Sequence, residues 1–146
     1  AVLADNDSPA VLKKLSTYAV PISIAAQLQD DVLGIFGEEK VIGKSALSDL
    51  AEGKQTLLIL EAKRRASEEQ KEALRKFVGK KDITQEEAGQ IKKIIVDTGA
   101  LQYTSKMARN FIDQAQTALE TWDAGWKGQD KHLFWAVSEA AIVREY

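Results

Sequence analysis

Apolar residues recur at intervals of three and four positions along almost the whole of this 146-residue chain. That interval places them on one face of an α-helix, whereas a strand would need strict alternation. Only two prolines interrupt the pattern. Because proline is the residue that most strongly disrupts a helix interior, the sequence predicts an all-α fold, with six helices packed as one bundle-like unit.

The first expected helix is long. Ser8 is a suitable N-cap, and Pro9 suits the first helical position, where a missing N–H costs nothing. The apolar pattern then continues to Gly37, and Pro21 within it predicts a bend. Residues 37–53 contain three glycines and alternating charge, which predicts a mobile surface connection with a functional role.

Five more helices are expected after this connection. Ser67 with Gln70, and Thr84 with Glu87, form the pattern of a capping box at the start of a helix. The expected ranges are 55–66, 68 to about 79, 85 to 99, about 100–122, and about 130 to the C-terminus, with a turn at 125–128.

Composition excludes several classes of function. Twenty Lys and Arg against 22 Asp and Glu give a net charge of −2, so a nucleic-acid partner is not expected. With no cysteine and one histidine, the chain has no thiolate nucleophile and no multi-histidine metal site. Its longest uncharged run, residues 15–29, is too short for a transmembrane segment, which needs about 20 apolar residues, and no signal peptide is evident. We therefore expect a cytoplasmic protein in which oxygen ligands hold any metal.

Large aromatic residues are expected to pack rather than to bind a ligand. Trp122, Trp126 and Trp135 are predicted to pack the last two helices together, and Phe77 is predicted to lie in the core. His132 is interpreted as a capping or surface histidine, and the paired basic residues as solvated helix ends and faces.

An acidic pair interrupts the most apolar part of the first helix. Asp30 and Asp31 are the only charged residues between positions 19 and 36. At 100° per residue they share one polar stripe with Ser23, Gln27 and Gly34, on a helix that is otherwise apolar and expected to be largely buried.

Two neighbouring carboxylates in apolar surroundings persist only where something cationic compensates them. Mg²⁺ is the economical candidate, because it prefers carboxylate and phosphate oxygens and is often held by one or two carboxylates plus the phosphates of a substrate. The alternative interpretation is that Asp30 and Asp31 form a solvated acidic edge without a ligand.

The segment around this pair resembles a known family. The residues are Ala-Gln-Leu-Gln-Asp-Asp-Val-Leu-Gly, then Phe-Gly-Glu-Glu-Lys-Val-Ile-Gly-Lys, then Ser-Asp-Leu-Ala-Glu-Gly-Lys-Gln-Thr-Leu-Leu. They resemble the second aspartate-rich motif of the trans-isoprenyl diphosphate synthases, or polyprenyl synthetases. The likeness is dense from about residue 25 to 60 and looser to residue 146.

The resemblance implies an isoprenoid synthase fold and a Mg²⁺-dependent condensation of isopentenyl diphosphate with an allylic diphosphate. It implies that Asp30 is the principal metal ligand, that Asp31 supports it, and that Lys44 grips the allylic diphosphate. It also implies that Gln27 and Lys54 contact the substrate. In the family, members are usually homo-oligomers, and the third aspartate of the motif is glycine in many bacterial members, as it is at Gly34 here.

The same resemblance implies that residues 1–146 correspond to the C-terminal half of a synthase domain. The family's first aspartate-rich motif, with the arginine pair after it, is not among these residues, and Asp30-Asp31 is their only Asp-Asp pair. We therefore expect this chain to be inactive by itself. The alternatives are a non-catalytic helical subunit or interaction module of a prenyl synthase assembly, and a structural bundle with an accidental motif.

Overall fold

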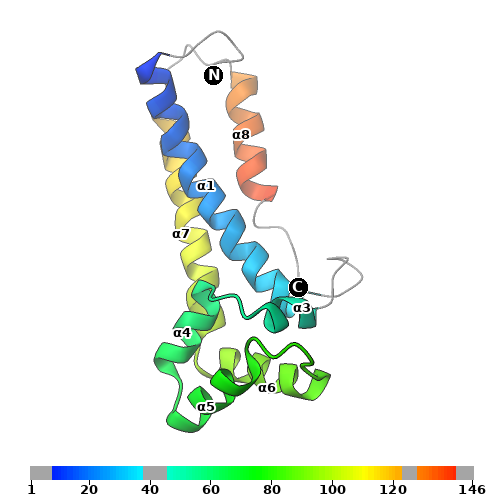
Figure 1. Cartoon of the computed structure of the whole chain (residues 1–146). Coiled ribbons are helices and arrows are strands. Elements are labelled where there is room, and N and C mark those ends of the chain that lie inside the picture. Colours follow the sequence, from blue (N-terminus) through cyan, green and yellow to red (C-terminus); the bar gives the residue numbers. More distant parts are fainter. Residues whose placement is uncertain (1–7, 38–45, 123–127, 141–146) are drawn as a thin grey trace. The chain divides into compact units, whose positions relative to one another are not determined.

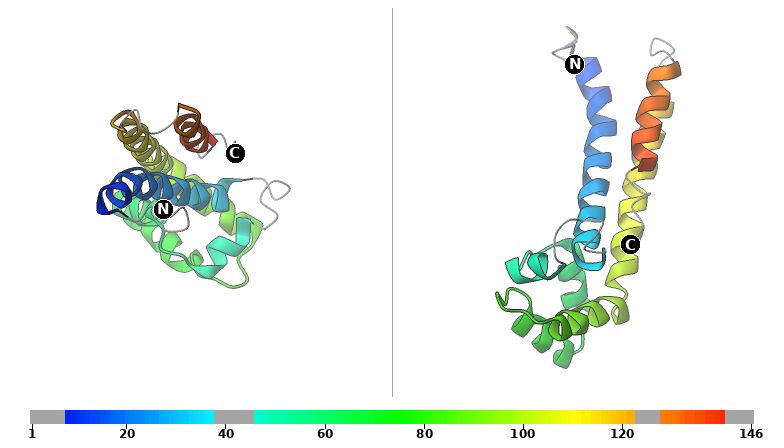
Figure 2. Two further views of the ribbon diagram at one scale, coloured as in Figure 1. Left: turned by 90° about the horizontal axis from the view of Figure 1, so that it is seen from above. Right: turned by 90° about the vertical axis from the view of Figure 1, so that its right-hand side faces the viewer.

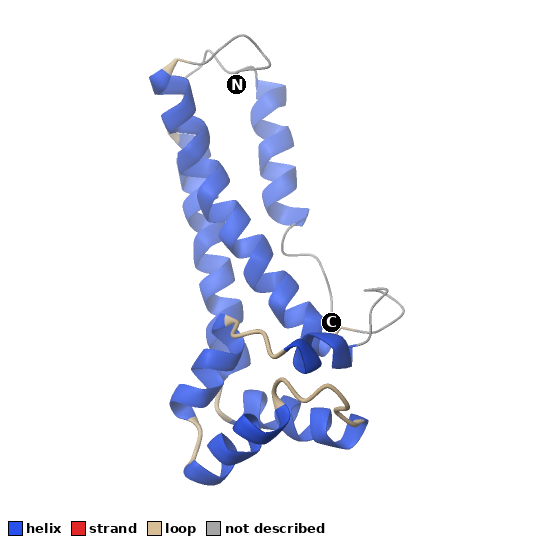
Figure 3. Cartoon of the chain, in the orientation of Figure 1, coloured by secondary structure: helices blue, strands red, loops and turns tan. Residues whose placement is uncertain are grey.

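Helices account for nearly all of the regular structure. The computed structural model describes residues 8–37, 46–122 and 128–140. In chain order they form α1 (Pro9–Phe36), α3 (Ala46–Glu52), α4 (Leu57–Arg65), α5 (Glu68–Phe77), α6 (Gln85–Asp97), α7 (Ala100–Glu120) and α8 (Gly128–Ala140) (Figure 1). The described residues contain no strand (Figure 3), so the prediction of an all-α fold is confirmed.

The helix ends form where the local sequence predicts them. The Oγ of Ser8 accepts a hydrogen bond from the N–H of Val11 at the start of α1. The N–H of Gly37 donates to the carbonyl of Leu33 at its end. Both predicted capping boxes are present at the starts of α5 and α6. The bend at Pro21 stays a prediction.

One expected loop contains a helix. Residues 37–53 were expected to be a mobile connection throughout, but residues 46–52 form α3. Leu47, Leu50 and Ala51 recur at helical spacing, and Leu50 is buried in the core with the other two packed beside it. Burial of this small apolar face offsets the low helix-forming tendency of so short a segment. Residues 38–45 lie outside the described residues.

The described helices group into two compact units. Among the described residues, one unit is built from residues 8–27, 107–122 and 128–140, and the other from residues 28–37 and 46–106. Both α1 and α7 contribute to each unit, because a long helix can pack one end on one set of partners and its other end on another set.

The unit formed by residues 28–106 has a core assembled from many short helices. The end of α1, the helices α3 to α6 and the start of α7 all contribute apolar side chains, and α4, α5 and α6 pack together (Figures 1 and 2). The most deeply buried large side chains are those of Val32, Leu50, Leu58, Ile59, Leu74, Ile91 and Ile95. Phe77 is also buried, as predicted.

The other unit is held together by an aromatic cluster. Tyr18 on α1 lies edge-on to Trp122 and Phe134, with ring centroids 6.1 and 5.1 Å away. The hydroxyl of Tyr18 donates to the carbonyl of Phe134 at 2.6 Å. Trp122 therefore packs on the last helix as predicted, whereas Trp135 is 40% exposed and is not a core residue. Trp126 lies outside the described residues.

Candidate functional site

The polar stripe of α1 reaches the surface. Gln27 and Asp30 are exposed, while Asp31 and Gly34 are half-buried. The neighbouring side of the same segment faces the core through buried apolar residues, namely Leu28, Val32 and Ile35. The expectation that α1 is largely buried is correct for this side alone, because Val20 and Ile24 on the same helix are exposed.

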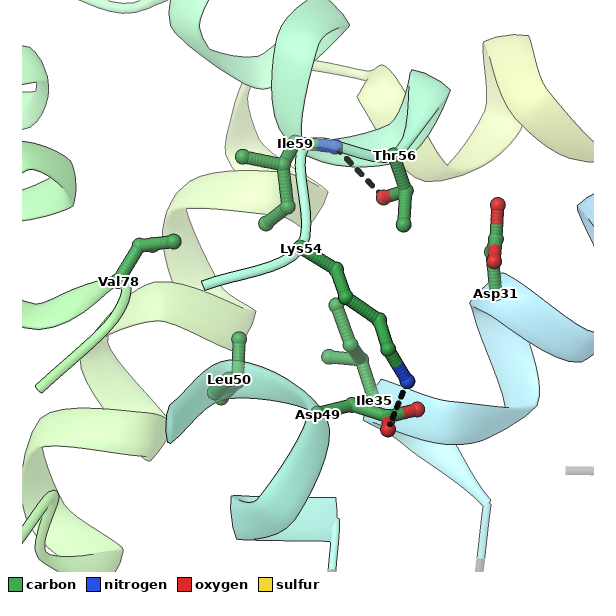
Figure 4. Close-up of a pocket in the computed structure, with 8 residues that line it drawn as sticks. All are labelled: Asp31, Ile35, Asp49, Leu50, Lys54, Thr56, Ile59 and Val78. Atoms are coloured by element: carbon green, nitrogen blue, oxygen red, sulfur yellow. Dashed lines mark hydrogen bonds and ion pairs between the residues drawn. The ribbon is translucent and has the colours of Figure 1, made fainter. Parts of the chain in front are cut away.

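A small pocket lies beside this stripe, within the unit formed by residues 28–106. It is lined by Asp31, Ile35, Asp49, Leu50, Lys54, Thr56, Ile59 and Val78 (Figure 4). Its volume of about 10 Å³ is room for one water molecule. A diphosphate is much larger, so a diphosphate recognised here would sit over the mouth of the pocket and contact the polar groups around it.

The side chain of Lys54 carries the positive charge at this pocket. Its Nζ lies 2.8 Å from Oδ1 of Asp49 and 3.0 Å from Oε2 of Glu52. Hydrogen bonds to these two carboxylates raise the pKa of Lys54 above its ordinary value, so the side chain is charged at every physiological pH. Figure 4 shows Asp31 on α1 at one side of the pocket, with Lys54 and Asp49 at the other.

A tight turn positions Lys54. Gly53 has φ +68°, in the left-handed region that favours glycine, and ends α3. The N–H of Gly79 donates to the carbonyl of Leu50 at 2.8 Å, which ties the end of α5 to α3. Thr56 then caps α4 by accepting from the N–H of Ile59. The residues between these anchors, 54 and 55, therefore follow a short, well-defined path.

The structure brings together some of the residues singled out from the sequence. Asp31 and Lys54, which are 23 positions apart in the sequence, line the same pocket. Asp30 is an exposed neighbour of Asp31, and Gln27 belongs to the part of α1 that precedes this unit. Lys44 lies outside the described residues.

Sequence reasoning did not single out Asp49. Its signal was present in the segment Ser-Asp-Leu-Ala-Glu-Gly-Lys, where an aspartate precedes Lys54 by five residues. That spacing acquires meaning only when α3 and the turn at Gly53 bring the two side chains together.

Acidic residues alone do not form a metal site in the part of the chain that the structure describes. No group of three or more His, Asp or Glu side chains lies close enough to hold an ion there. A divalent metal bound by Asp30 and Asp31 would need further oxygen ligands from water or from a bound anion.

A larger concavity lies in the other unit, with a volume of about 540 Å³. Its lining residues are Ser16, Thr17, Val20, Pro21, Gln114, Thr117, Ala118 and Thr121. None of these side chains carries a charge, so this concavity has no group suited to hold a diphosphate or its metal. Separately, none of the helices among the described residues is both long and apolar enough to cross a membrane.

The described residues thus form an all-α fold in which paired carboxylates on one helix lie at a pocket that is also lined by a lysine. A sequence model of polyprenyl synthetase matches residues 1–96. The chain belongs to the polyprenyl synthetase family.

Individual relatives agree with this assignment. A geranylgeranyl diphosphate synthase of Saccharolobus solfataricus is 37% identical over 123 residues, which are 84% of this chain and 37% of that protein. Another, from Methanosarcina mazei, is 32% identical over 144 residues, 99% of this chain and 42% of that protein. The chain therefore spans about two fifths of the length of these relatives.

Solved structures share the fold. A geranylgeranyl pyrophosphate synthase of Corynebacterium glutamicum, complexed with isoprenyl diphosphate and magnesium, matches with a TM-score of 0.87 and 31% identity over 94% of this chain and 39% of that chain. A geranylgeranyl pyrophosphate synthetase of Pyrococcus horikoshii matches with a TM-score of 0.83 and 28% identity, covering 96% and 41% of the two chains.

Proposed function

We propose that this chain forms one wall of the active site of a prenyl diphosphate synthase, which condenses isopentenyl diphosphate with an allylic diphosphate. The observation that carries the proposal is the pairing of Asp31 and Lys54 across one pocket. Carboxylates on one side suit a metal, and an ammonium on the other suits a phosphate oxygen. Membership of the family and the names of its relatives support the same reaction.

The residues present fit Mg²⁺. Asp30 and Asp31 offer carboxylate oxygens at an accessible part of α1. Mg²⁺ is commonly held by one or two carboxylates together with substrate phosphates, so two aspartates and a diphosphate form a suitable set of donors. The solved relative with isoprenyl diphosphate and magnesium supports this choice of ion. When bound, the ion would neutralise charge on the diphosphate as it leaves.

The proposed roles of the side chains follow from charge. Departure of the diphosphate breaks the allylic C–O bond and leaves a carbocation. The ammonium of Lys54, and that of Lys44 in the residues that the structure does not describe, would stabilise the negative charge that develops on the leaving group. Apolar helix faces would keep water from the carbocation until the new C–C bond forms and a proton is lost, commonly to the released diphosphate. Gln27 would contribute a polar contact to the substrate.

We further propose that residues 1–146 form the C-terminal half of the synthase domain. A segment preceding them would then supply the other wall of the site. We also propose that the natural protein is a homo-oligomer. This chain alone is then expected to be inactive. The natural protein should have about twice the mass of these residues, and intact mass spectrometry of the purified protein would measure it. A mass equal to that of the 146 residues would contradict this part of the proposal.

Substitution of Asp30 tests the reaction. In the natural protein, Asp30→Ala should lower the rate of condensation by about 100-fold or more, because a proposed carboxylate ligand of the Mg²⁺ that would neutralise the leaving diphosphate is lost. The rate is measured with isopentenyl diphosphate, an allylic diphosphate and Mg²⁺, and circular dichroism checks that the helices persist.

The matched control is Asp97→Ala, which removes an exposed aspartate at the end of α6 whose surface ion pair with Lys93 contributes little. It should leave the rate within about twofold of the wild type. Near-normal turnover in Asp30→Ala would contradict the proposed role. A natural protein that folds but catalyses no condensation would favour the non-catalytic subunit instead.

A further inference from the structure

The helices α1 and α3 approach each other closely at Gly34. The carboxylate of Asp49 on α3 lies where a side chain at position 34 would be. Gly34 is a helical glycine of α1, and a Cβ built on it would collide with Oδ2 of Asp49 and lie 3.1 Å from its Cγ. The carboxylate of Asp49 therefore occupies the space next to the α1 backbone that any other residue at position 34 would fill. A larger residue at position 34 would therefore need the side chain of Asp49 to move, and no unusual backbone conformation is involved.

The same carboxylate anchors the lysine of the pocket. Through Oδ1 it contacts Nζ of Lys54 at 2.8 Å, while its Oδ2 faces Gly34. The side chain of Asp49 is 25% exposed, whereas Glu52, the other carboxylate at Lys54, is 57% exposed. An exposed ion pair is weakened by solvent and by side-chain freedom, so Asp49 is the partner that can fix the position of Lys54.

An ammonium group has three N–H donors, of which the described carboxylates engage two. One donor is left for a phosphate oxygen, and the contact with the less exposed Asp49 fixes the position of the nitrogen that carries it. On this basis we propose that Asp49, seated against Gly34, is a positioning residue that aims the Lys54 ammonium at a diphosphate bound beside Asp31. The inference rests on the proposed function and adds to it two residues, Gly34 and Asp49, that act through Lys54.

Binding of inorganic diphosphate to the natural protein in the presence of Mg²⁺, measured by titration calorimetry, tests the inference directly. Asp49→Ala should weaken binding by about tenfold, because the lysine loses its anchor. Its matched control is Glu52→Gln, which removes the exposed carboxylate at the same lysine and should change binding by no more than about twofold. Lys54→Met should weaken binding at least as much as Asp49→Ala.

Gly34→Ala tests whether Asp49 needs the room that glycine leaves beside it. An added methyl group should displace the carboxylate of Asp49 without unfolding α1, since alanine favours helix more than glycine does. Binding should weaken about tenfold while the thermal unfolding temperature is retained. Gly89→Ala on α6, where an added Cβ meets no atom within 4 Å, is the matched control and should alter neither quantity adversely.

The double variant of Gly34 and Asp49 shows whether the two residues act together on Lys54 or whether each substitution disturbs the protein independently. In the Asp49→Ala background, Gly34→Ala should add no further loss of diphosphate binding, because the colliding carboxylate is already gone. In turnover assays, both single variants should raise KM for the allylic diphosphate more than they lower kcat.

The outcomes distinguish this inference from the proposed function. If the wild-type protein binds no diphosphate, the proposed function itself fails. If it binds diphosphate and Asp49→Ala binds equally well, the positioning role alone is overturned. Equal binding by Lys54→Met would overturn the positioning role and also the proposed contact of Lys54 with the diphosphate. Additive losses from Gly34→Ala and Asp49→Ala would also overturn it, because they would show that the two residues act independently.

Discussion

Glu61 shows how one charged side chain can be stabilised in the core of a small unit. Its side chain on α4 is only 8% exposed, and its carboxylate lies 2.7 Å from Arg64 and 2.6 Å from Arg65. Arg65 in turn lies over the ring of Tyr103 on α7, 4.9 Å from its centroid. The basic end of α4, expected to be wholly solvated, is thus partly used to hold α4 against the start of α7.

This network predicts a pH-dependent contribution to stability. Hydrogen bonds from Arg64, and then from Arg65, lower the pKa of Glu61 from 4.5 to about 2 in the folded protein. Because the folded state binds the proton more weakly than the unfolded state, the stabilisation is complete above pH 4.5 and is lost as the pH falls towards 2.

Thermal unfolding of wild type and Glu61→Gln across this pH range measures the effect. The wild type should have the higher Tm at pH 7, and the difference should shrink as the pH falls from 4.5 to 2. Glu72→Gln, which removes an exposed partner of Arg75, serves as the control and should show only a small difference in Tm throughout. A difference for Glu61→Gln that is unchanged at low pH would contradict the assignment.

At the scale of elements, the junction between α3 and α5 depends on two glycines. Gly53 has φ +68°, and a Cβ added to it would lie 2.9 Å from the Cα of Gly79. Both the backbone conformation and the space therefore exclude a larger residue. The turn at Gly53 also directs Lys54 into the pocket, so stability and the site depend on the same contact.

Gly53→Ala should destabilise the protein by about 2 kcal/mol, which combines the cost of a left-handed alanine with that of moving the Gly79 backbone. Urea unfolding of the natural protein measures the free-energy change. Gly89→Ala, in the open interior of α6, should be neutral or stabilising by up to about 1 kcal/mol. Equal stability of Gly53→Ala and the wild type would show that the two helix ends can move apart freely.

At the scale of the whole molecule, apolar side chains on two helices face outward. Val20 on α1 is 56% exposed and Leu133 on α8 is 65% exposed. Other exposed large apolar residues of these two helices are Leu12, Ile24, Trp135 and Val137. Large exposed apolar surfaces are typical of sites that contact further protein.

We therefore expect the isolated 146-residue chain to self-associate or to exchange helices between copies. Sedimentation velocity over a range of concentrations measures this, and the combined variant Val20→Glu with Leu133→Glu should shift the distribution towards the monomer. Val96→Glu, at an exposed apolar position on α6, serves as the comparison and should have less effect. A monodisperse wild-type monomer at every concentration would contradict the expectation.

The sequence by itself determined the helical class, most helix boundaries and two of the eight residues that line the pocket. Helix periodicity, caps and terminal glycines act within a few residues, so Ser8, Ser67 and Thr84 could be recognised as helix starts. The acidic pair was conspicuous because charges are rare in an apolar helix, and Lys54 was found through the family resemblance.

Only the tertiary structure decided the rest. The helix α3 forms because Leu50 finds a core made by other helices, which local propensity does not reveal. Asp49 became significant because Gly34, 15 positions earlier in the sequence, leaves room for its carboxylate. Division into two units depends on how the long helices α1 and α7 share their partners. Such relations join residues that are distant along the chain, so they arise from packing and not from any local pattern.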